Sequence, residues 1–408
     1  MTSSKNNASF VTAVLPTSTA GDTIQALTED QNANAMITKA RGTLLQDHWW
    51  RAWVPPISPA KTKLQLLVPD QDLDRVLKLI VEHGKLHLQA SGAVFSHQAD
   101  NLYLGSEFRL LSSETVSNPA QNQHAMKSNL RAIFCTSSHA DSDKLAKAAI
   151  NAGAHGPIVY YCEGHGLRDR LGWLRITKEA EQEVLLIVAD SDESDVVFDA
   201  VARAGEMHLP GRGFMYQIDL NQGMFNLPSH LSNQRFDANM QQIINAIDHL
   251  SGHTHWRDNA DFNPNQGSQT NIALNQALEN AITLDQVCIT AMVDRDHSQQ
   301  AMDLMLDAGA PGVTSSFASL LTHEETSQFA NAQVNQEYAV MNSIVNQATA
   351  SKVKQYIEQE AENAGLRDLC AFTVAVPKEV HYKPGKTDHR ARPQRTTVAP
   401  AQHASSSA

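Results

Sequence analysis

Two stretches of this chain have similar sequences. GKLHLQASGAVF begins at Gly84, and GEMHLPGRGFMY begins at Gly205, with no gap between the aligned copies. Each stretch is preceded by the same three elements: an apolar strand, an acidic turn and an amphipathic helix. The two strands are residues 64–68 and 184–188. The sequence therefore contains an internal repeat, and its fold must be built from matching strand-helix-strand halves.

Apolar residues in the two repeated helices recur at spacings of three and four, as on one buried helix face. The residues are Leu73, Val76, Leu77 and Ile80 in one helix and Val197, Ala200, Val201 and Ala204 in the other.

A second similarity links KLAKAAINAGAHG at 144–156 to AMDLMLDAGAPG at 301–312, each after an apolar strand. The second similarity defines the first half of a larger unit, and the segments at Gly84 and Gly205 close its second half. Each unit therefore contains two strand-helix-strand elements, and the chain contains three such units.

The three units differ in how clearly they can be recognised. We predict the first over 9–105, with a degenerate front half, the second over 128–222, and the third over 284–381. Residues 223–283 form a helical connection. The fold class predicted is α+β.

Composition agrees with several domains and excludes some functions. The chain has 408 residues, 42% of them hydrophobic, enough for separate cores. It lacks a continuous apolar run of about 18 residues and an N-terminal secretion signal, so we expect a cytoplasmic protein with no membrane insertion. A net charge of -12 argues against nucleic-acid partners. The cysteines form no close pairs of the zinc-binding kind, so we expect them to be buried apolar residues.

The connection between the second and third units contains an apolar stripe at helical spacing, from Met240 to Leu250, and a second helix is expected over 272–282. His253 and His255 are followed by Asp258 and Asp261. This cluster is either a metal site or an ordinary loop, and its spacing, which matches no specific ligand pattern, favours the loop.

The C-terminal tail, residues 382–408, is basic and rich in Pro, Ser and Ala. Its cations are Lys383, Lys386, Arg390, Arg392 and Arg395. Such a segment cannot bury enough apolar surface to offset its ordering entropy, so we expect it to be disordered. It is either a solubilising tail or an arm that binds a partner.

Three motifs of the second unit occur in the order typical of one protein family. They are NAGAHGPIVYYCEGHG at 151–166, a strand and helix from EQEVLLIVAD at 181–190 onward, and LPGRGFMYQID at 209–219. This unit resembles the PII signal-transduction family and its PII-like relatives. The resemblance implies a ferredoxin-like βαββαβ fold, assembly of three subunits, and small ligands, usually adenine nucleotides, between neighbouring subunits. Three tandem units in one chain would then form an intramolecular pseudo-trimer, with ordinary self-association of whole chains as the rival.

The same resemblance implies a ligand site at two glycine turns. Gly164 and Gly166 bracket His165, and Gly211 and Gly213 bracket Arg212. Arg168 adds positive charge in the following loop. Glycines let backbone N–H groups approach a phosphate, and arginine can bind it bidentately. ATP, ADP or AMP is the expected ligand if the site is functional, but the glycines could equally make tight turns.

This sequence departs from the family pattern in two ways. The family's basic residue after the second glycine turn is Phe214 here, and the long loop with a modifiable tyrosine is shortened to 167–181. The first unit has Ala90, Ser91 and Gly92 at the second turn, and the third has no paired glycines.

The loop of the first unit contains DHWWRAWVPP, with Trp49, Trp50 and Trp53 close together. These side chains either fold over the domain as a lid or anchor a protein partner. Both interpretations stay open, and the cost of exposing Trp to water favours packing.

Weighing these observations, we predict a non-catalytic regulatory protein that binds a ligand between domains and controls a partner. The family implies a transporter or a metabolic enzyme of nitrogen or inorganic-carbon metabolism as that partner. The alternative is a scaffolding or self-assembling protein that keeps the fold without the ligand. We find no GxSxG, HExxH or Walker motif that would indicate an enzyme.

Overall fold

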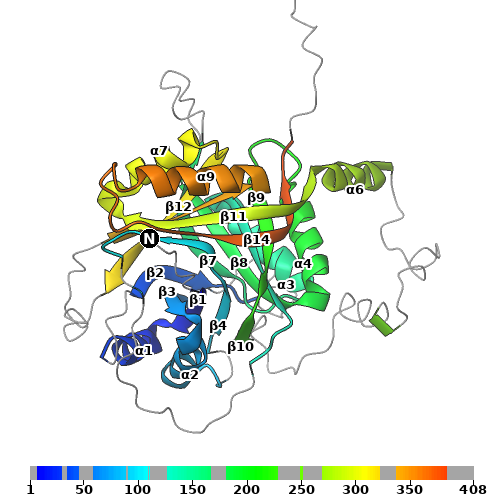
Figure 1. Cartoon of the computed structure of the whole chain (residues 1–408). Coiled ribbons are helices and arrows are strands. Elements are labelled where there is room, and N and C mark those ends of the chain that lie inside the picture. The colour runs from blue at the N-terminus through cyan, green and yellow to red at the C-terminus, as the bar shows by residue number, and fades with distance from the viewer. Residues whose placement is uncertain are drawn as a thin grey trace, which may run out of the picture.

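A computed structural model describes residues 7–29, 35–45, 58–88, 91–108, 110, 126–166, 181–227, 249–250, 269–321 and 337–383. Within these residues the protein is a mixed α+β structure with one large antiparallel sheet of 14 strands (Figure 1). The α+β class predicted from the sequence is confirmed.

Strands and helices follow one another in the same order in three segments. Segment 1 contains β1 (Ala8–Pro16), α1 (Thr17–Glu29), β2 (Ala35–Gly42), β3 (Ala60–Pro69), α2 (Leu73–His83), β4 (Ala93–Gln98) and β5 (Asp100–Leu104). Segment 2 contains β6 (Leu130–Ser138), α3 (Ser142–Asn151), β7 (Ile158–Gly166), β8 (Glu181–Asp190), α4 (Ser191–Ala204), β9 (Phe214–Leu220) and β10 (Gln222–Phe225). Segment 3 contains β11 (Ile282–Asp294), α7 (Ser298–Asp307), β12 (Gly312–Leu321), β13 (Glu337–Val345), α9 (Gln347–Glu360) and β14 (Cys370–His381), and α6 (Gln269–Ala281) precedes it.

Strand order is also the same in the three segments. It is β4-β1-β3-β2 in segment 1, β9-β6-β8-β7 in segment 2 and β14-β11-β13-β12 in segment 3. Each segment places its first and third strands in the middle and its second and fourth strands outside. The second and fourth strands are therefore free to pair with other segments.

The second strands of the three segments pair with one another at the centre of the molecule. The end of β2 pairs with the beginning of β7, with Ala40 opposite Tyr160. The end of β7 pairs with the beginning of β12, and the end of β12 pairs with the beginning of β2. Each strand thus joins the next in a closed cycle.

The fourth strands make a second cycle of contacts through their extensions. In segment 1 the extension β5 pairs with β14, and in segment 2 the extension β10 pairs with β4. In segment 3 the last residues of β14 pair with β9, with His381 opposite Phe214. Each pair of segments is therefore joined by two separate strand pairings.

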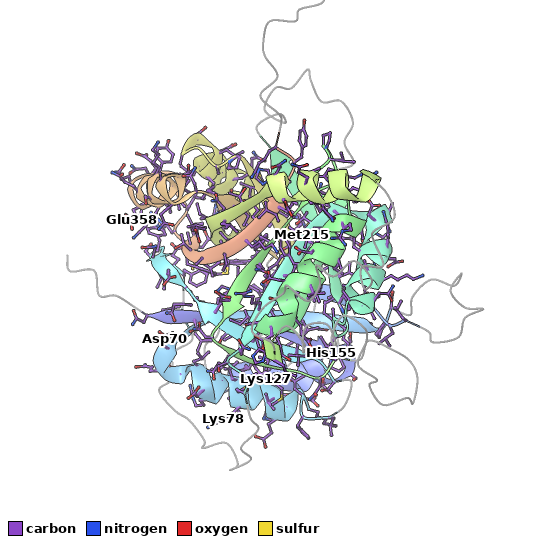
Figure 2. All side chains as sticks on the ribbon, turned by 90° about the vertical axis from the view of Figure 1, so that its right-hand side faces the viewer. Asp70, Lys78, Lys127, His155, Met215 and Glu358 are labelled. Atoms are coloured by element: carbon purple, nitrogen blue, oxygen red, sulfur yellow. The ribbon has the colours of Figure 1, made fainter. Side chains whose placement is uncertain are left out.

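Phe225 of β10 lies opposite Ala93 of β4 in segment 1, and its ring also contacts side chains that precede β6 and follow α3. Lys127 Nζ lies 4.8 Å from the centre of its ring, and the His155 ring lies 5.6 Å from it. Figure 2 labels Lys127 and His155 at the boundary between segments 1 and 2. The sequence predicted a connection from residue 223 onward, whereas β10 continues to Phe225.

Alternate residues of each strand belong to two kinds of core. One face of each segment packs under its own helices, as Ile187 does beneath Phe198 in segment 2. The other faces meet inside the molecule, where residues of all three segments form shared cores, among them Phe95, Tyr216 and Val376. The helices consequently lie on the outside (Figure 1).

The repeated segment found in the sequence is a helix end. After α2 and after α4, a residue with positive φ, Lys85 at 52° and Glu206 at 51°, ends the helix. The next amide N–H then donates back to a carbonyl, Leu86 to Val81 at 2.9 Å and Met207 to Ala202 at 3.1 Å. This is a left-handed C-cap closed by a buried apolar residue, which explains why Leu or Met recurs. Glycine recurs before it for want of space, since a Cβ at Gly84 would lie 2.6 Å from the Ile80 carbonyl oxygen and one at Gly205 2.4 Å from Met207 Cε.

Several other predictions can be compared with the described residues. All four cysteines are free and buried, as expected. The helix expected at 272–282 corresponds to α6, whose Leu278 and Ala281 pack on the core of segment 2. The stripe from Met240 to residue 248, the cluster at 253–261 and the tail from residue 384 lie outside the described residues.

Candidate functional site

The first glycine turn predicted from the sequence is not a turn in the structure, because its residues form the end of β7. Gly164, His165 and Gly166 are strand residues paired with Thr314, Val313 and Gly312 of β12. His165 Nε2 lies 3.6 Å from Glu163 Oε2. The Gly164–Gly166 segment is therefore a strand end located where segments 2 and 3 meet.

The second glycine turn precedes β9 in the same segment. Gly213 has φ +110°, and a Cβ at this position would lie 1.9 Å from the carbonyl oxygen of Thr136. Gly211 has φ +82° but open space around it. Glycine at 213 is required because the turn packs directly on β6, whether or not a ligand binds there.

Arg212, between these glycines, is already engaged with carboxylates. Its guanidinium lies 2.7 Å from Glu206 Oε2 and 4.0 Å from Asp141 Oδ2. Asp141 in turn accepts a hydrogen bond of 2.9 Å from the Ser138 hydroxyl. A phosphate bound by Arg212 would have to displace or share these acidic partners.

The two predicted turns lie at the same end of the segment 2 sheet but do not touch. Strand order there is β9-β6-β8-β7, so β6 and β8 separate them. Three strand spacings correspond to roughly 14 Å. A single phosphate could not contact both turns, although a ligand as long as a nucleotide could span them.

A polar network at the boundary of segments 1 and 2 was not found from the sequence. Arg41 of β2 lies 2.8 Å from Asp143 Oδ1 and 3.0 Å from Glu183 Oε2. Glu183 also contacts His139 Nδ1, at 3.0 Å, and accepts a hydrogen bond from the Ser142 hydroxyl. Burial opposes the charge of Arg41, but the hydrogen bonds to the two carboxylates outweigh it and raise its pKa.

Electrostatics at this end of segment 2 are dominated by carboxylates. Among the described residues, Arg212 and His165 each have an acidic partner, while Glu181 and Glu183 begin the neighbouring strand. Carboxylates raise the cost of bringing in a polyphosphate. The described residues can thus hold the turns in place, but their cations are largely neutralised.

Segments 1 and 3 differ from segment 2 at the second turn. In segment 1, Gly92 makes the same close approach as Gly213, since a Cβ there would lie 2.0 Å from the Val14 carbonyl oxygen. In segment 3, Leu369 is buried at the turn, and Asp368 accepts a 2.6 Å hydrogen bond from the Asp294 amide. In segment 3 the Leu369 side chain therefore fills the turn before the fourth strand.

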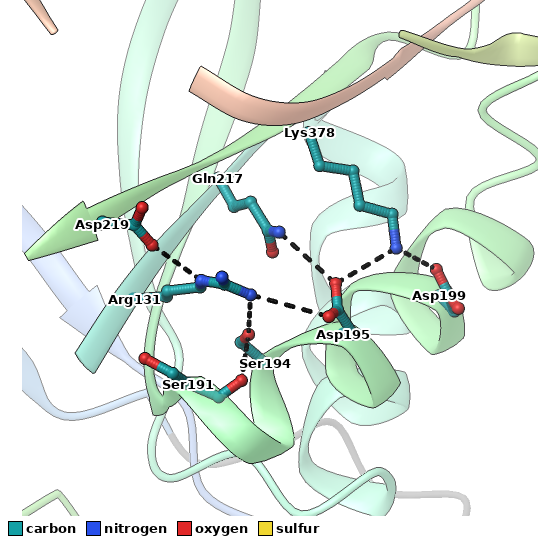
Figure 3. Close-up of polar contacts among 8 residues, drawn as sticks. All are labelled: Arg131, Ser191, Ser194, Asp195, Asp199, Gln217, Asp219 and Lys378. Atoms are coloured by element: carbon teal, nitrogen blue, oxygen red, sulfur yellow. Dashed lines mark hydrogen bonds and ion pairs between the residues drawn. The ribbon is translucent and has the colours of Figure 1, made fainter. Parts of the chain in front are cut away.

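A second charged network joins segments 2 and 3 on the outside (Figure 3). Lys378 of β14 lies 3.3 Å from Asp195 and 2.9 Å from Asp199 of α4. Arg131 of β6 lies 2.8 Å from Asp219 and 3.6 Å from Asp195. Asp195 therefore contacts both Arg131 of segment 2 and Lys378 of segment 3. Through Lys378 this network holds the extended end of β14 against α4.

The remaining predicted site residues lie outside the described residues: Arg168, Trp49, Trp50 and Trp53. The described part of the chain contains no group of three or more His, Cys, Asp or Glu placed to hold a metal ion. None of the described helices is long and apolar enough to cross a membrane.

Comparison with known proteins gives little further information. No protein-family model matches the chain, and no curated protein matches it. Among solved structures, the aspartate kinase from Synechocystis is similar with a TM-score of 0.20 and 10% identity, over 90% of this chain and 43% of the kinase chain. The chain thus spans less than half of that kinase, and at this TM-score the likeness carries no argument about fold or activity.

Proposed function

We propose that this chain is a non-catalytic, PII-like regulatory protein whose three ferredoxin-like units form a pseudo-trimer within one chain. The observation that carries this proposal is the cyclic pairing of β2, β7 and β12. A second cycle, through the extensions of the fourth strands, supports it. Contacts that three separate subunits would make in a trimer are made here between segments of one chain.

This arrangement leaves little reason for whole chains to associate. The second and fourth strands of every segment already have partners in the other two segments. Light scattering should therefore give the mass of one chain, 44.7 kDa, over a wide concentration range. A mass of three chains that persists on dilution would support ordinary self-association instead.

The regulatory part of the proposal rests on the connections that follow the central strands. In PII-like proteins this connection carries the signal to a partner, here proposed to be a transporter or a metabolic enzyme. The connection after β2 contains Trp49, Trp50 and Trp53. Affinity capture from the native host with the wild type and a triple Trp→Ala variant tests this, because only the wild type should retain a partner.

Binding of ATP, ADP or AMP at the end of segment 2 is proposed from the two glycine turns. Their separation of roughly 14 Å fits a ligand of nucleotide length. Calorimetry with each nucleotide is the test, with Arg212→Met as the matched variant. Heat of binding that is lost in this variant would support the site.

A scaffolding role without a ligand is the second candidate. It is favoured by the commitment of Arg212 to Glu206 and Asp141 and of His165 to Glu163. The same calorimetry separates the two candidates, because a scaffold should give no heat and no thermal shift with any of the nucleotides. Partner capture should then be independent of nucleotide.

A further inference from the structure

Lys63 is a fully buried lysine in the shared interior of the three segments. On β3 its neighbours Leu64 and Leu66 pack under the helices of segment 1, so Lys63 points to the opposite, inner face. Only 1% of the residue is exposed. Lysine is almost never fully buried without a paired charge, so its presence here calls for an explanation.

Its partner is an aromatic ring from another segment. Lys63 Nζ lies 3.6 Å from the centre of the Tyr160 ring on β7 of segment 2. No carboxylate among the described residues forms an ion pair with Lys63. The Tyr160 ring therefore offsets only part of the cost of burying the charged form of Lys63, and the buried site favours the neutral amine.

The groups that the structure describes around Lys63 do not supply a counter-ion. Directly opposite on the neighbouring strands are Val14 of β1 and Thr38 of β2. From β7 the phenol of Tyr160 and the thiol of Cys162 face it, and burial keeps both protonated by raising their pKa values. Along β3 itself lies Lys61, whose Nζ donates to the Ser91 carbonyl at 3.2 Å.

Burial therefore lowers the pKa of Lys63 to about 7. When the contact between the segments opens and water reaches the amine, the pKa returns toward its ordinary value of 10.5. The open form consequently binds a proton more strongly than the closed form, so acidification favours opening.

The contact between Lys63 and Tyr160 lies where segments 1 and 2 are joined. Three register pairs connect β2 to β7, and Tyr160 opposite Ala40 is one of them. The next pair contains Arg41, whose ion pairs hold the outer side of the same strands. Any displacement of Tyr160 by a charged Lys63 must act on this short pairing.

We propose that Lys63 is a proton-controlled latch between segments 1 and 2, in which the neutral amine lets the β2–β7 pairing close and the ammonium loosens it. The device is a property of the closed interior and does not depend on nucleotide binding. It gives the chain a response to proton concentration near neutrality.

Hydrogen exchange followed by mass spectrometry tests the latch directly. Peptides covering β2 and β7 are compared at pH 6 and pH 8.5 after correction for the intrinsic pH dependence of exchange. With pKa values of about 7 when closed and about 10.5 when open, the wild type should open about thirty-fold more at pH 6. In the Lys63→Val variant most of this pH response should be lost, and what remains is expected to come from Lys61, whose pKa burial also lowers.

Valine is a suitable replacement because the corresponding strand positions are already valine. Equivalent positions on the third strands β3, β8 and β13 are those of Lys63, Val184 and Val340. In each segment this residue pairs with a residue of the first strand, and that residue pairs on its other side with the first residue of the fourth strand. Lys63→Met, which keeps the length of the side chain, serves if the smaller side chain disturbs packing. Lys61 is not a suitable control, because burial lowers its pKa as well. Lys39→Met, at an exposed lysine of β2, is the control and should keep the response of the wild type.

Two results would overturn the proposal. One is equal corrected exchange of β2 and β7 at the two pH values in the wild type. The other is a pH response that remains unchanged in both Lys63→Val and Lys63→Met, because another group would then control the opening.

Discussion

Arg41 of segment 1 and Glu183 of segment 2 form an ion pair of 3.0 Å across the boundary between their segments. The Glu183 side chain is only 12% exposed, so this pair is screened by solvent less than an ordinary surface pair. The two residues are far apart in the sequence and on strands that the sequence alone does not bring together. Their contact reports whether the segments are assembled.

Replacing Arg41 by Met should lower the free energy of unfolding by about 1–3 kcal/mol, because Glu183 and Asp143 would lose a charged hydrogen-bond donor. Chemical denaturation measures this change. The control is Arg367→Met, which removes a largely exposed pair with Glu107 at 3.7 Å and should change stability by less than about 0.5 kcal/mol. Equal effects of the two variants would argue against an assembled boundary.

Gly213→Ala should be strongly destabilising, by about 2–4 kcal/mol, since the new methyl group meets the Thr136 carbonyl oxygen and the backbone is left-handed. Gly211→Ala shares the positive φ but has open space, so we expect about 1 kcal/mol. Thermal unfolding of the two variants gives the comparison. If alanine at 213 cost no more than at 211, the turn would not pack on β6 as described.

The stability of the wild type should rise as the pH increases from about 7 to about 10.5. Lys63 has a lowered pKa in the folded protein, so the unfolded chain binds more protons in this window, and removing protons favours folding. Lys63→Met should add about 3–5 kcal/mol near pH 7, and this gain should shrink toward pH 10.5. Urea titrations over this range measure the effect, and a gain that does not vary with pH would contradict it.

Lys378 should fasten the end of β14 to α4. Its side chain is 15% exposed and lies near Asp195, Asp199 and the Phe198 ring, so Lys378→Met should cost about 1–2 kcal/mol. Lys354→Met, which removes an exposed pair with Glu358 and an exposed hydrogen bond to Asn101, should cost no more than about 0.5 kcal/mol. Hydrogen exchange at 378–381 should increase in the first variant alone.

Local features of this fold could be predicted from the sequence because their causes are local. The apolar spacing from Leu73 to Ile80 predicted α2, and the repeated segment after Gly84 and Gly205 corresponds to helix ends defined by one backbone conformation and one buried residue. The paired glycines at 211 and 213 were also recognised, but their packing against β6 depends on the fold, so the sequence left a turn and a ligand site equally open.

The contacts between segments could not be predicted in the same way. The long polar residues Lys61, Lys63 and Gln65 stand at every second position of β3, a pattern typical of a strand with one solvated face. The face is buried because strands distant in the sequence enclose it. Likewise, nothing near Arg41 in the sequence indicates that Glu183 will be its partner.

The central claim is that the three segments pair with one another within one chain. Amide–amide NOEs in a deuterated sample test it, recorded with labelled chains diluted into an excess of unlabelled chains. We predict cross-peaks between β2 and β7, between β7 and β12, and between β12 and β2, all undiminished by the dilution once scaled to the amount of labelled protein. Loss of these cross-peaks on dilution, or their absence in a folded sample, would contradict a pseudo-trimer formed by one chain.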